Sequence, residues 1–434
     1  MFSFSQYART ITITVGVALF CISLLLLACV ARRPGSSGKK TYHGGKDHLC
    51  TFSGEPDHLP GHVAFRDDEL AEAGVLRETN QHLRPLVAVT GGAGFIGSHV
   101  VELLLKQGMR VRVVDDFSTG KKQYLANAAE AAQNDPSKLE IVRADLRKKR
   151  TAEQAVRGAA CVAHLAAEAK VRPSLYPSRP EAFARVHRSN VDATVHVLRA
   201  AFEEGQRRNA TPPRVVFASS STVYAAASSR AGQSETGTPL RPITPYAATK
   251  AMAEHAIAAH ARAYGVPALS LRIFMCYGPR EPSEGAHAVV TGVYRAAAAA
   301  GKPAVIYGDG SQTRDFVHVT DVARAVVMAC MSNRSALAPL LDVGASVNVG
   351  TGFTTTIASL AHATGLAVER QPERRLDLRA TRADTCLARS ALGFTSSMPH
   401  EHVFEHVRKP VAEQPRVDAI DRKLAPFFVS TDEP

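Results

Sequence analysis

A glycine-rich turn between a short apolar strand and an apolar helix constrains the fold of this chain more than any other feature. Residues 86–90 read L-V-A-V-T, residues 91–97 read G-G-A-G-F-I-G, and residues 98–106 continue as an apolar helical stretch. Glycines here let the chain turn sharply and let backbone N–H groups approach a phosphate at the helix N-terminus. A second predicted strand over 110–114 leads into Asp115. A carboxylate at that point binds the adenosine ribose and repels a 2′-phosphate, so the pattern predicts a site for NAD rather than NADP.

Strands and helices continue to alternate after this unit. The sequence predicts further strands over 139–142, 160–163 and 214–218, with a long helix over 191–204 before the last of them. Alternation of this kind is typical of a parallel, doubly wound sheet, and ligands of such sheets bind at the carboxyl ends of the strands. We therefore expect an α/β fold with a Rossmann-like sheet. Asp115 and Asp145 fall at strand ends, where a ligand would bind.

A Tyr-x-x-x-Lys pattern opens the helix that is predicted over 246–264. Tyr246 and Lys250 share a helix face. A lysine ammonium near a phenol favours the phenolate and lowers the phenol pKa from its ordinary value of about 10. The motif S-S-S-T-V-Y at 219–224 follows the fifth strand, and a hydroxyl there can complete a proton relay. Such a pattern is common by itself, but after a dinucleotide-binding unit it indicates a catalytic site.

These motifs together resemble the extended short-chain dehydrogenase/reductase family, in its nucleotide-sugar epimerase branch, over about residues 85–398. The resemblance includes H-L-A-A at 164–167, Y-G-P-R at 277–280, G-D-G-S-Q-T-R-D-F-V-H-V-T-D at 308–321 and N-V-G-T-G at 348–352. The motif Y-A-A-T-K at 246–250 is most similar to the corresponding motif of UDP-glucuronate 4-epimerases. The resemblance implies an NAD-binding domain over 85–276. It also implies a smaller, interleaved substrate-binding lobe over 277–398 and a C-terminal tail over 399–434.

The resemblance also implies the residues of the site. The catalytic residues would be Ser220, Tyr246 and Lys250. Those implied to bind NAD are Gly91, Gly94, Phe95, Ile96, Gly97, Asp115, Asp145, Leu146, Ala166, Asn190, Tyr246 and Lys250. Those implied to bind the substrate are Ser220, Tyr307, Arg314, Arg374 and Asp377, with Tyr307 stacked on uracil and Arg314 on the diphosphate. A guanidinium suits a diphosphate because it donates two parallel hydrogen bonds.

The implied reaction is C4 epimerisation of a UDP-sugar, either UDP-glucuronate or UDP-glucose, through a 4-keto intermediate. Decarboxylases and 4,6-dehydratases of the same fold carry carboxylates beside the catalytic hydroxyl, where this chain has Ser221 and Thr222. That difference favours an epimerase. Another enzyme of this fold and a non-catalytic NAD-binding membrane regulator remain the alternatives. Ala225 and Met275 depart from the family's usual Gly and Asn, which leaves the choice of sugar open.

The charge and the cysteine content of the chain restrict the kinds of ligand that it is expected to bind. The net charge is +12, concentrated in the middle of the chain, and Trp is absent. Without a nucleic-acid-binding motif, this charge favours a small phosphate-bearing ligand over nucleic acid. The seven cysteines lack the spacing of a zinc site or a disulfide framework, so we expect no metal. Cys161 and Cys276 are expected to be small buried residues.

The N-terminal region predicts a membrane anchor followed by a linker. Residues 11–31 carry no charge over 21 positions, enough at about 1.5 Å per residue to cross a bilayer core of about 30 Å. We expect a single-pass anchor over 1–31 and a stem over 32–84, with a Golgi or endoplasmic reticulum location in a eukaryote. Flanking charges leave the side of the membrane open. By the same family resemblance, helices at about 182–204 and 246–264 would form the interface of a homodimer.

Overall fold

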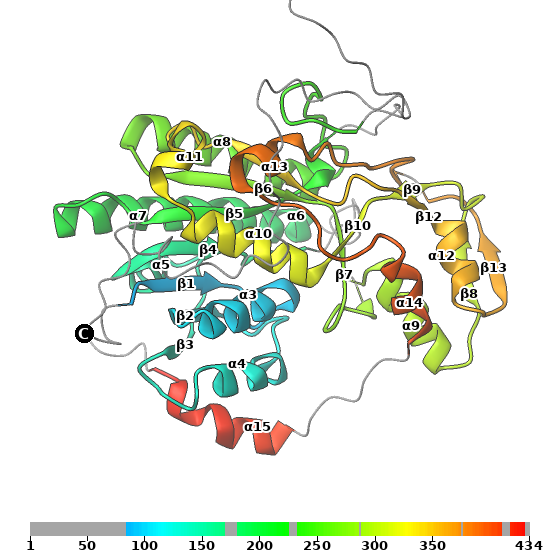
Figure 1. Ribbon diagram of the computed structural model, residues 1–434, viewed down its shortest axis with the longest axis horizontal. Coiled ribbons are helices and arrows are strands. Elements are labelled where there is room, and N and C mark those ends of the chain that lie inside the picture. Colours follow the sequence, from blue (N-terminus) through cyan, green and yellow to red (C-terminus); the bar gives the residue numbers. More distant parts are fainter. Residues whose placement is uncertain are drawn as a thin grey trace, which may run out of the picture. The chain divides into compact units, whose positions relative to one another are not determined.

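A parallel sheet of seven strands is the centre of the fold. The structure is a computed structural model that describes residues 84–169, 180–224, 232–285, 288–374, 376–409 and 417–429. The strands are β1 (Leu86–Thr90), β2 (Arg110–Asp115), β3 (Leu139–Arg143), β4 (Ala159–His164), β5 (Arg214–Ser220), β6 (Ala268–Ile273) and β11 (Ser346–Val349). Their order is β11-β6-β5-β4-β1-β2-β3, and every neighbouring pair is parallel. The strands from β6 to β3 can be followed in Figure 1. The predicted Rossmann-like sheet is confirmed, and its order reverses between β1 and β4, where such sheets bind ligands.

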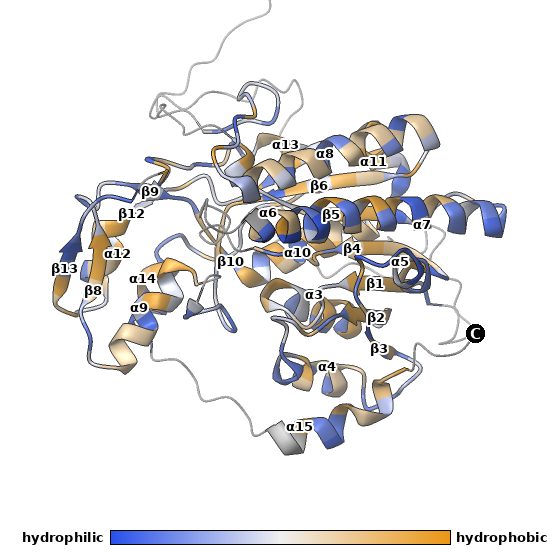
Figure 2. Cartoon of the chain, turned by 180° about the vertical axis from the view of Figure 1, so that it is seen from behind, coloured by the Kyte–Doolittle hydropathy of each residue, from blue (hydrophilic) through white to orange (hydrophobic). Residues whose placement is uncertain are grey.

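Helices cover both faces of the sheet, because successive side chains of a strand point to opposite sides. Val87 and Val89 of β1 pack in the cluster that contains α3 (Phe95–Lys106) and α10 (Val319–Met331). Ala88, between them, packs in the opposite cluster, to which α5 (Lys149–Val156), α7 (Ala193–Arg208) and α8 (Pro245–Tyr264) contribute. Figure 2 shows α7 alternating between hydrophobic and hydrophilic positions, as expected for a helix with one face on a sheet.

A smaller lobe is built from short strand pairs and helices beside the carboxyl end of the sheet. Its strand pairs are β7 (Met275–Tyr277) with β10 (Phe316–His318), β8 (Ala304–Tyr307) with β13 (Val368–Gln371), and β9 (Thr313–Arg314) with β12 (Thr355–Thr356). Its helices are α9 (Val290–Ala299), α12 (Ile357–Ala363) and α14 (His402–Arg408). Because α10 and β11 return to the main body between β10 and β12, this lobe is interleaved with the central sheet.

The remaining elements connect or cover these two parts. They are η2 (Lys122–Leu125), α4 (Ala126–Ala131), α6 (Pro180–His187), the π-turn η4 (Arg188–Asp192), η5 (Ser221–Val223), α11 (Arg334–Leu341), α13 (Cys386–Leu392), α15 (Val417–Leu424) and η7 (Ala425–Phe427). The segment expected to be a C-terminal tail therefore contributes two helices. Helix α14 packs on α9 and α12, and α15 packs on η2 and α4. Both helices are only two turns long, so the sequence carries too short a periodic pattern to predict them.

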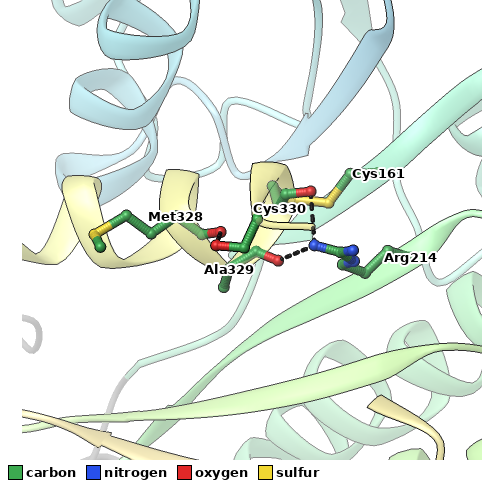
Figure 3. Close-up of a disulfide and its surroundings, with 6 residues drawn as sticks. Cys161, Arg214, Met328, Ala329 and Cys330 are labelled. Carbon is green, nitrogen blue, oxygen red and sulfur yellow. Dashed lines mark hydrogen bonds between the residues drawn. A yellow bond between two sulfur atoms is a disulfide. The ribbon is translucent and has the colours of Figure 1, made fainter. Parts of the chain in front are cut away.

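A disulfide joins Cys161 of β4 to Cys330 near the end of α10 (Figure 3). The two Cα atoms lie 5.8 Å apart across a sequence separation of 169 residues. Beside the bridge, Arg214 of β5 donates hydrogen bonds to the carbonyl oxygens of Ala329 and Cys330, at 2.7 and 3.0 Å. The expectation that Cys161 is only a small buried residue is wrong, because the packing of α10 on β4 brings the two cysteines together. Cys276 is a buried free thiol, as expected.

The predicted membrane segment, residues 11–31, lies outside the described residues. So does the predicted linker up to residue 83. Among the helices that the structure describes, none combines the length and the apolar character needed to cross a bilayer.

Candidate active site

The turn after β1 has the close backbone approach that a pyrophosphate site needs. Gly91 has a φ of +67°, and a Cβ there would lie 2.7 Å from the backbone nitrogen of Ala166. A Cβ on Gly97 would collide with the carbonyl oxygen of Gly91. Gly94 is the N-cap of α3. A side chain at Gly91 or Gly97 would collide with the backbone, so these glycines allow the tight turn that leads into α3. The first N–H groups of a helix have no partner within it, and a phosphate can bind there.

The two predicted carboxylates stand at the ends of neighbouring strands. Asp115 ends β2 and accepts hydrogen bonds from the backbone N–H groups of Ala93 and Phe117, at 3.0 and 2.8 Å. Burial raises the pKa of Asp115 above its ordinary value. Asp145 follows β3 and accepts hydrogen bonds from the Arg147 guanidinium at 2.8–3.0 Å, which lower its pKa. Both side chains line the cavity described below.

Asn190 is placed differently from the other predicted residues. Its side chain is fully buried and is not among the residues that line the cavity. Its amide accepts from the N–H of Glu168 and donates to the carbonyl of Glu168 and to the Thr249 hydroxyl. Asn190 therefore fastens the loop after β4 to α8 from behind the wall of the cavity. Because this buried amide bonds to two separate elements, it stabilises their arrangement next to the cavity.

One large cavity collects the remaining predicted residues at the carboxyl end of the sheet. Its volume is about 1800 Å³, beyond the roughly 300–1,000 Å³ of a pocket for one small molecule. A dinucleotide and a second ligand can therefore occupy it together. The predicted residues on its wall are Gly91, Gly94, Phe95, Ile96, Gly97, Asp115, Asp145, Leu146, Ala166, Ser220, Tyr246, Lys250, Tyr307, Arg314, Arg374 and Asp377.

The catalytic residues meet where β5 ends and α8 begins. Thr244 caps α8 by accepting a hydrogen bond from the N–H of Ala247, and a proline at the first helical position fixes the start of the helix. This start places Tyr246 on the cavity wall, in a hydrogen bond with Ser220 at the end of β5. One turn later, the Lys250 ammonium donates to the carbonyl oxygen of Ala218 at 2.7 Å.

Burial moves the pKa values of the two ionisable groups in this relay in opposite directions. It raises the pKa of Tyr246 to about 12, while the Ser220 hydrogen bond lowers it. It lowers the pKa of Lys250 to about 7, while the charge of Glu254 raises it. We expected Lys250 to lower the pKa of Tyr246. The structure differs, because the ammonium is turned to the Ala218 carbonyl, 5.9 Å from the centre of the Tyr246 ring.

A buried polar network behind these residues was not predicted from the sequence. The Ser219 hydroxyl donates to Glu254 at 2.5 Å, and the Arg272 guanidinium donates to Glu254 at 2.7 Å and to the Tyr224 hydroxyl at 2.8 Å. Tyr224 in turn donates to the side-chain oxygen of Asn348 at 2.7 Å. The network joins α8 to β5, β6 and β11. The available signal was the position of Glu254, four residues after Lys250 on the same helix face.

The substrate-side residues lie together in the smaller lobe. Arg314 is buried and pairs with Asp377 at 2.5 Å. The Arg374 guanidinium lies over the Tyr307 ring, 3.1 Å from its centre. A guanidinium is cationic and planar. Arg314 and Arg374 can therefore bind a diphosphate through their charge and can stack on a nucleotide base. The structure thus places the four residues that the resemblance assigned to the nucleotide in one region.

Three histidines on the cavity wall were not predicted. His318 caps α10, and His402 and His406 come from α14. His402 Nδ1 and the Tyr277 hydroxyl lie 3.1 Å apart, and His406 Nε2 lies 2.7 Å from a Glu281 carboxylate oxygen. Burial lowers the pKa of His318 to about 4. No sequence signal indicated His402 and His406, because the helix that carries them was not predicted.

The comparisons with known proteins agree on one family. Residues 87–350 match the model of the NAD dependent epimerase/dehydratase family. A UDP-glucose 4-epimerase from Mycolicibacterium smegmatis is 34% identical over 330 residues, which is 74% of this chain and 96% of that protein. A UDP-N-acetyl-alpha-D-glucosaminuronate decarboxylase from Bacillus cytotoxicus is 33% identical over 244 residues, 56% of this chain and 70% of that protein.

Solved structures extend the comparison to other reactions and to bound ligands. The structure of MoeE5 in complex with UDP-glucuronic acid and NAD has a TM-score of 0.60 and 33% identity, covering 75% of this chain and 99% of that one. The dTDP-glucose 4,6-dehydratase DesIV from Streptomyces venezuelae, with NAD bound, has a TM-score of 0.63 and 27% identity, covering 74% and 96%. Epimerases, a decarboxylase and a dehydratase are thus all similar to this chain. The chain belongs to the NAD-dependent epimerase/dehydratase family of extended short-chain dehydrogenase/reductase enzymes and uses NAD.

Proposed function

We propose that this protein catalyses the C4 epimerisation of a UDP-sugar, either UDP-glucuronate or UDP-glucose. The observation that carries this proposal is the surroundings of Ser220. The backbone N–H of Thr222 donates to the Ser220 hydroxyl oxygen at 3.2 Å, and the Thr222 hydroxyl donates to it at 3.0 Å. Ser221 and Thr222 do not ionise near neutral pH. Decarboxylation or dehydration needs a further acid or base beside the oxidised sugar, and these two positions do not supply one.

The residues of the chain have separate roles in this reaction. NAD held by the turn at Gly91–Gly97 and by Asp115 would supply reversible hydride-transfer chemistry at C4 of the sugar. Tyr246 removes the proton from the 4-hydroxyl, and the Ser220 hydrogen bond favours its phenolate. Lys250 holds the end of β5 through the Ala218 carbonyl. The 4-keto sugar then turns within the cavity, and the proton returns from Tyr246.

The smaller lobe would hold the nucleotide during this turn. Arg314 would exchange Asp377 for the diphosphate, since a buried guanidinium needs an anionic partner. A base that stacks on Tyr307 where Arg374 now lies would displace that guanidinium toward the phosphates. Anchoring the nucleotide while the sugar rotates exposes both faces of C4 to the same cofactor, as epimerisation requires.

Product analysis tests the reaction type. We expect the full chain, incubated with UDP-glucuronate or UDP-glucose, to give only the C4 epimer by NMR. Release of carbon dioxide with a pentose product would identify a decarboxylase, and a stable 4-keto-6-deoxy sugar a dehydratase. Bound NAD without turnover of any UDP-sugar would support the non-catalytic regulator instead.

We further propose that residues 11–31 anchor the protein in a membrane, with the enzyme domain on an oxidising side such as the lumen of the secretory pathway. The Cys161–Cys330 disulfide supports that side, because disulfides persist in oxidising compartments and are rare in a reducing cytosol. Retention in the pellet after alkaline extraction tests the anchor. Protection of the domain from protease in intact vesicles tests the side, and cleavage there would place the domain in the cytosol.

A homodimer is the proposed assembly. Phe183 of α6 and Met252 of α8 are exposed to 41% and 43%, which is high for large apolar side chains on packed helices. Both helices belong to the regions that the family resemblance assigns to the dimer interface. A Met252→Glu variant that runs as a monomer in light scattering, beside a dimeric parent protein, would support this assembly.

A further inference from the structure

We propose that the C-terminal segment 417–429 positions the adenosine side of the NAD site, with Phe428 as the residue that holds it. The cofactor then binds to a preformed wall, and its affinity depends on a helix that the sequence does not predict. The inference rests on NAD binding and not on the proposed reaction.

The wall in question is the loop after β2 together with η2 and the start of α4. The residues of this wall that line the cavity are Asp115, Asp116, Ser118, Thr119, Lys121, Gln123, Tyr124, Ala126 and Asn127. Phe117 lies within the loop with a φ of +58°, a conformation that is unfavourable for an aromatic residue. Its N–H donates to the Asp115 carboxylate at 2.8 Å. The ribose-binding carboxylate is therefore oriented in part by a residue whose backbone needs outside support.

That support comes from the C-terminal segment. The Phe428 ring packs on the Phe117 ring with centres 6.0 Å apart, and the Lys122 ammonium lies 5.4 Å from the centre of the Phe428 ring. The N–H of Val429 donates to the carbonyl of Ile141 at 3.0 Å, which fastens the segment to the edge strand β3. Neither Phe117 nor Phe428 is among the residues that line the cavity, so Phe428 contacts the loop away from the cavity.

Apolar burial fixes the segment in place. Ile420, Leu424 and Phe427 are 3%, 0% and 2% exposed and belong to the same core cluster as α3 and α4. In Figure 1, α15 lies directly beneath α4. Two ion pairs accompany this packing, Lys122–Asp421 and Lys423–Glu130, but exposed pairs of this kind hold a helix only weakly. The core contacts are the main anchor.

The consequence for the cofactor is preorganisation. Ordering a loop during binding costs free energy and so weakens the affinity for the ligand. A loop that is already ordered before binding adds no such cost. Loss of Phe428 releases Phe117 from its unfavourable conformation and lets the Asp115 carboxylate turn. The effect should fall on NAD, whose ribose Asp115 of this wall would hold, and should spare the substrate nucleotide, which the residues of the smaller lobe would hold.

The test is the Phe428→Ala variant of the full chain, stripped of cofactor and titrated with NAD and with UDP by calorimetry. We expect the NAD dissociation constant to rise about threefold to tenfold, the range for loss of one aromatic pair. The UDP dissociation constant should stay unchanged. Phe428→Leu, which keeps apolar bulk against Phe117, should recover part of the affinity.

A matched control separates positioning from general loss of stability. Val403→Ala removes a fully buried side chain from α14, which packs in the smaller lobe. We expect this variant to lower the unfolding temperature while leaving the NAD dissociation constant unchanged. The inference is overturned if Phe428→Ala leaves NAD affinity within twofold of the parent, or if Phe428→Ala and Val403→Ala weaken NAD binding equally.

Discussion

The proposed reaction depends on the hydroxyl group of Tyr246. Tyr246→Phe keeps the ring on the cavity wall but removes the proton acceptor and the hydrogen bond with Ser220. We expect epimerisation to fall by at least about 10²-fold, the usual contribution of a general base, while NAD stays bound. Single-turnover assays and the absorbance of bound cofactor measure the two effects separately. Near-normal turnover would remove Tyr246 from the mechanism.

His164 makes the fold sensitive to acid. Its ring is fully buried between the hydroxyls of Thr90 and Thr194, and burial lowers its pKa to about 3 from an ordinary 6.5. Between these two values, the unfolded chain binds a proton that the folded chain excludes. The stabilisation is therefore fully present above about pH 6.5 and is lost as the pH falls toward 3, by about 2 kcal/mol between pH 7 and pH 5.

A His164→Gln variant tests this prediction, because an amide can keep hydrogen bonds to both threonines but does not titrate. We expect its free energy of unfolding in urea to change less between pH 7 and pH 5 than that of the parent protein. His255→Gln, at an exposed position of α8, is the control and should follow the parent. Equal pH dependence of all three proteins would show that His164 does not carry the effect.

At the scale of elements, α8 is held to the sheet by charge as well as by apolar contact. Glu254 and Arg272 form a buried pair whose side chains are 5% and 6% exposed. Removing one partner of a buried pair leaves the other charge without compensation. We expect Glu254→Ala to reduce the free energy of unfolding by about 3–5 kcal/mol, measured by urea denaturation.

Two further variants locate the source of that loss. Ser219→Ala removes one hydrogen bond to Glu254 and keeps the ion pair, so it should cost less, about 1–3 kcal/mol. Glu203→Ala breaks an exposed pair with Arg199 on α7 and should have little effect. If Glu254→Ala is no worse than Glu203→Ala, the buried network does not hold α8.

At the scale of the whole molecule, the Cys161–Cys330 bridge closes a long stretch of chain between the middle of the sheet and α10. Cross-linking distant residues restricts the unfolded chain and stabilises the fold, typically by about 2–4 kcal/mol. We expect the double variant Cys161→Ala, Cys330→Ala to lose stability by that amount in urea. Reduction of the parent protein should also lower its stability.

Cys276→Ala is the control for this prediction, because Cys276 is buried but free. Its stability should not respond to reductant differently from that of the parent. Peptide mapping under non-reducing conditions should recover a linked pair that contains residues 161 and 330. Recovery of both cysteines as free thiols from the native protein would contradict the bridge and the oxidising compartment proposed from it.

The sequence by itself determined the features that depend on local spacing. The glycines at 91, 94 and 97, the strand ends at Asp115 and Asp145, and the Tyr246–Lys250 spacing each follow from one stretch of chain. The backbone geometry of a turn or of a helix face needs only neighbours in sequence. For this reason the doubly wound sheet could be predicted before the fold was known, and every predicted site residue except Asn190 lies on the cavity wall.

The tertiary structure alone decided which distant residues share an environment. The family resemblance implies that Asn190 binds NAD, yet its amide bonds to Glu168 and Thr249 behind the cavity wall. Cys161 meets Cys330, and Glu254 meets Arg272, only because separate elements pack on the same sheet. Phe428 reaches Phe117 from the far end of the chain. Burial, charge pairing and pKa depend on these contacts through space, which no short segment of sequence specifies.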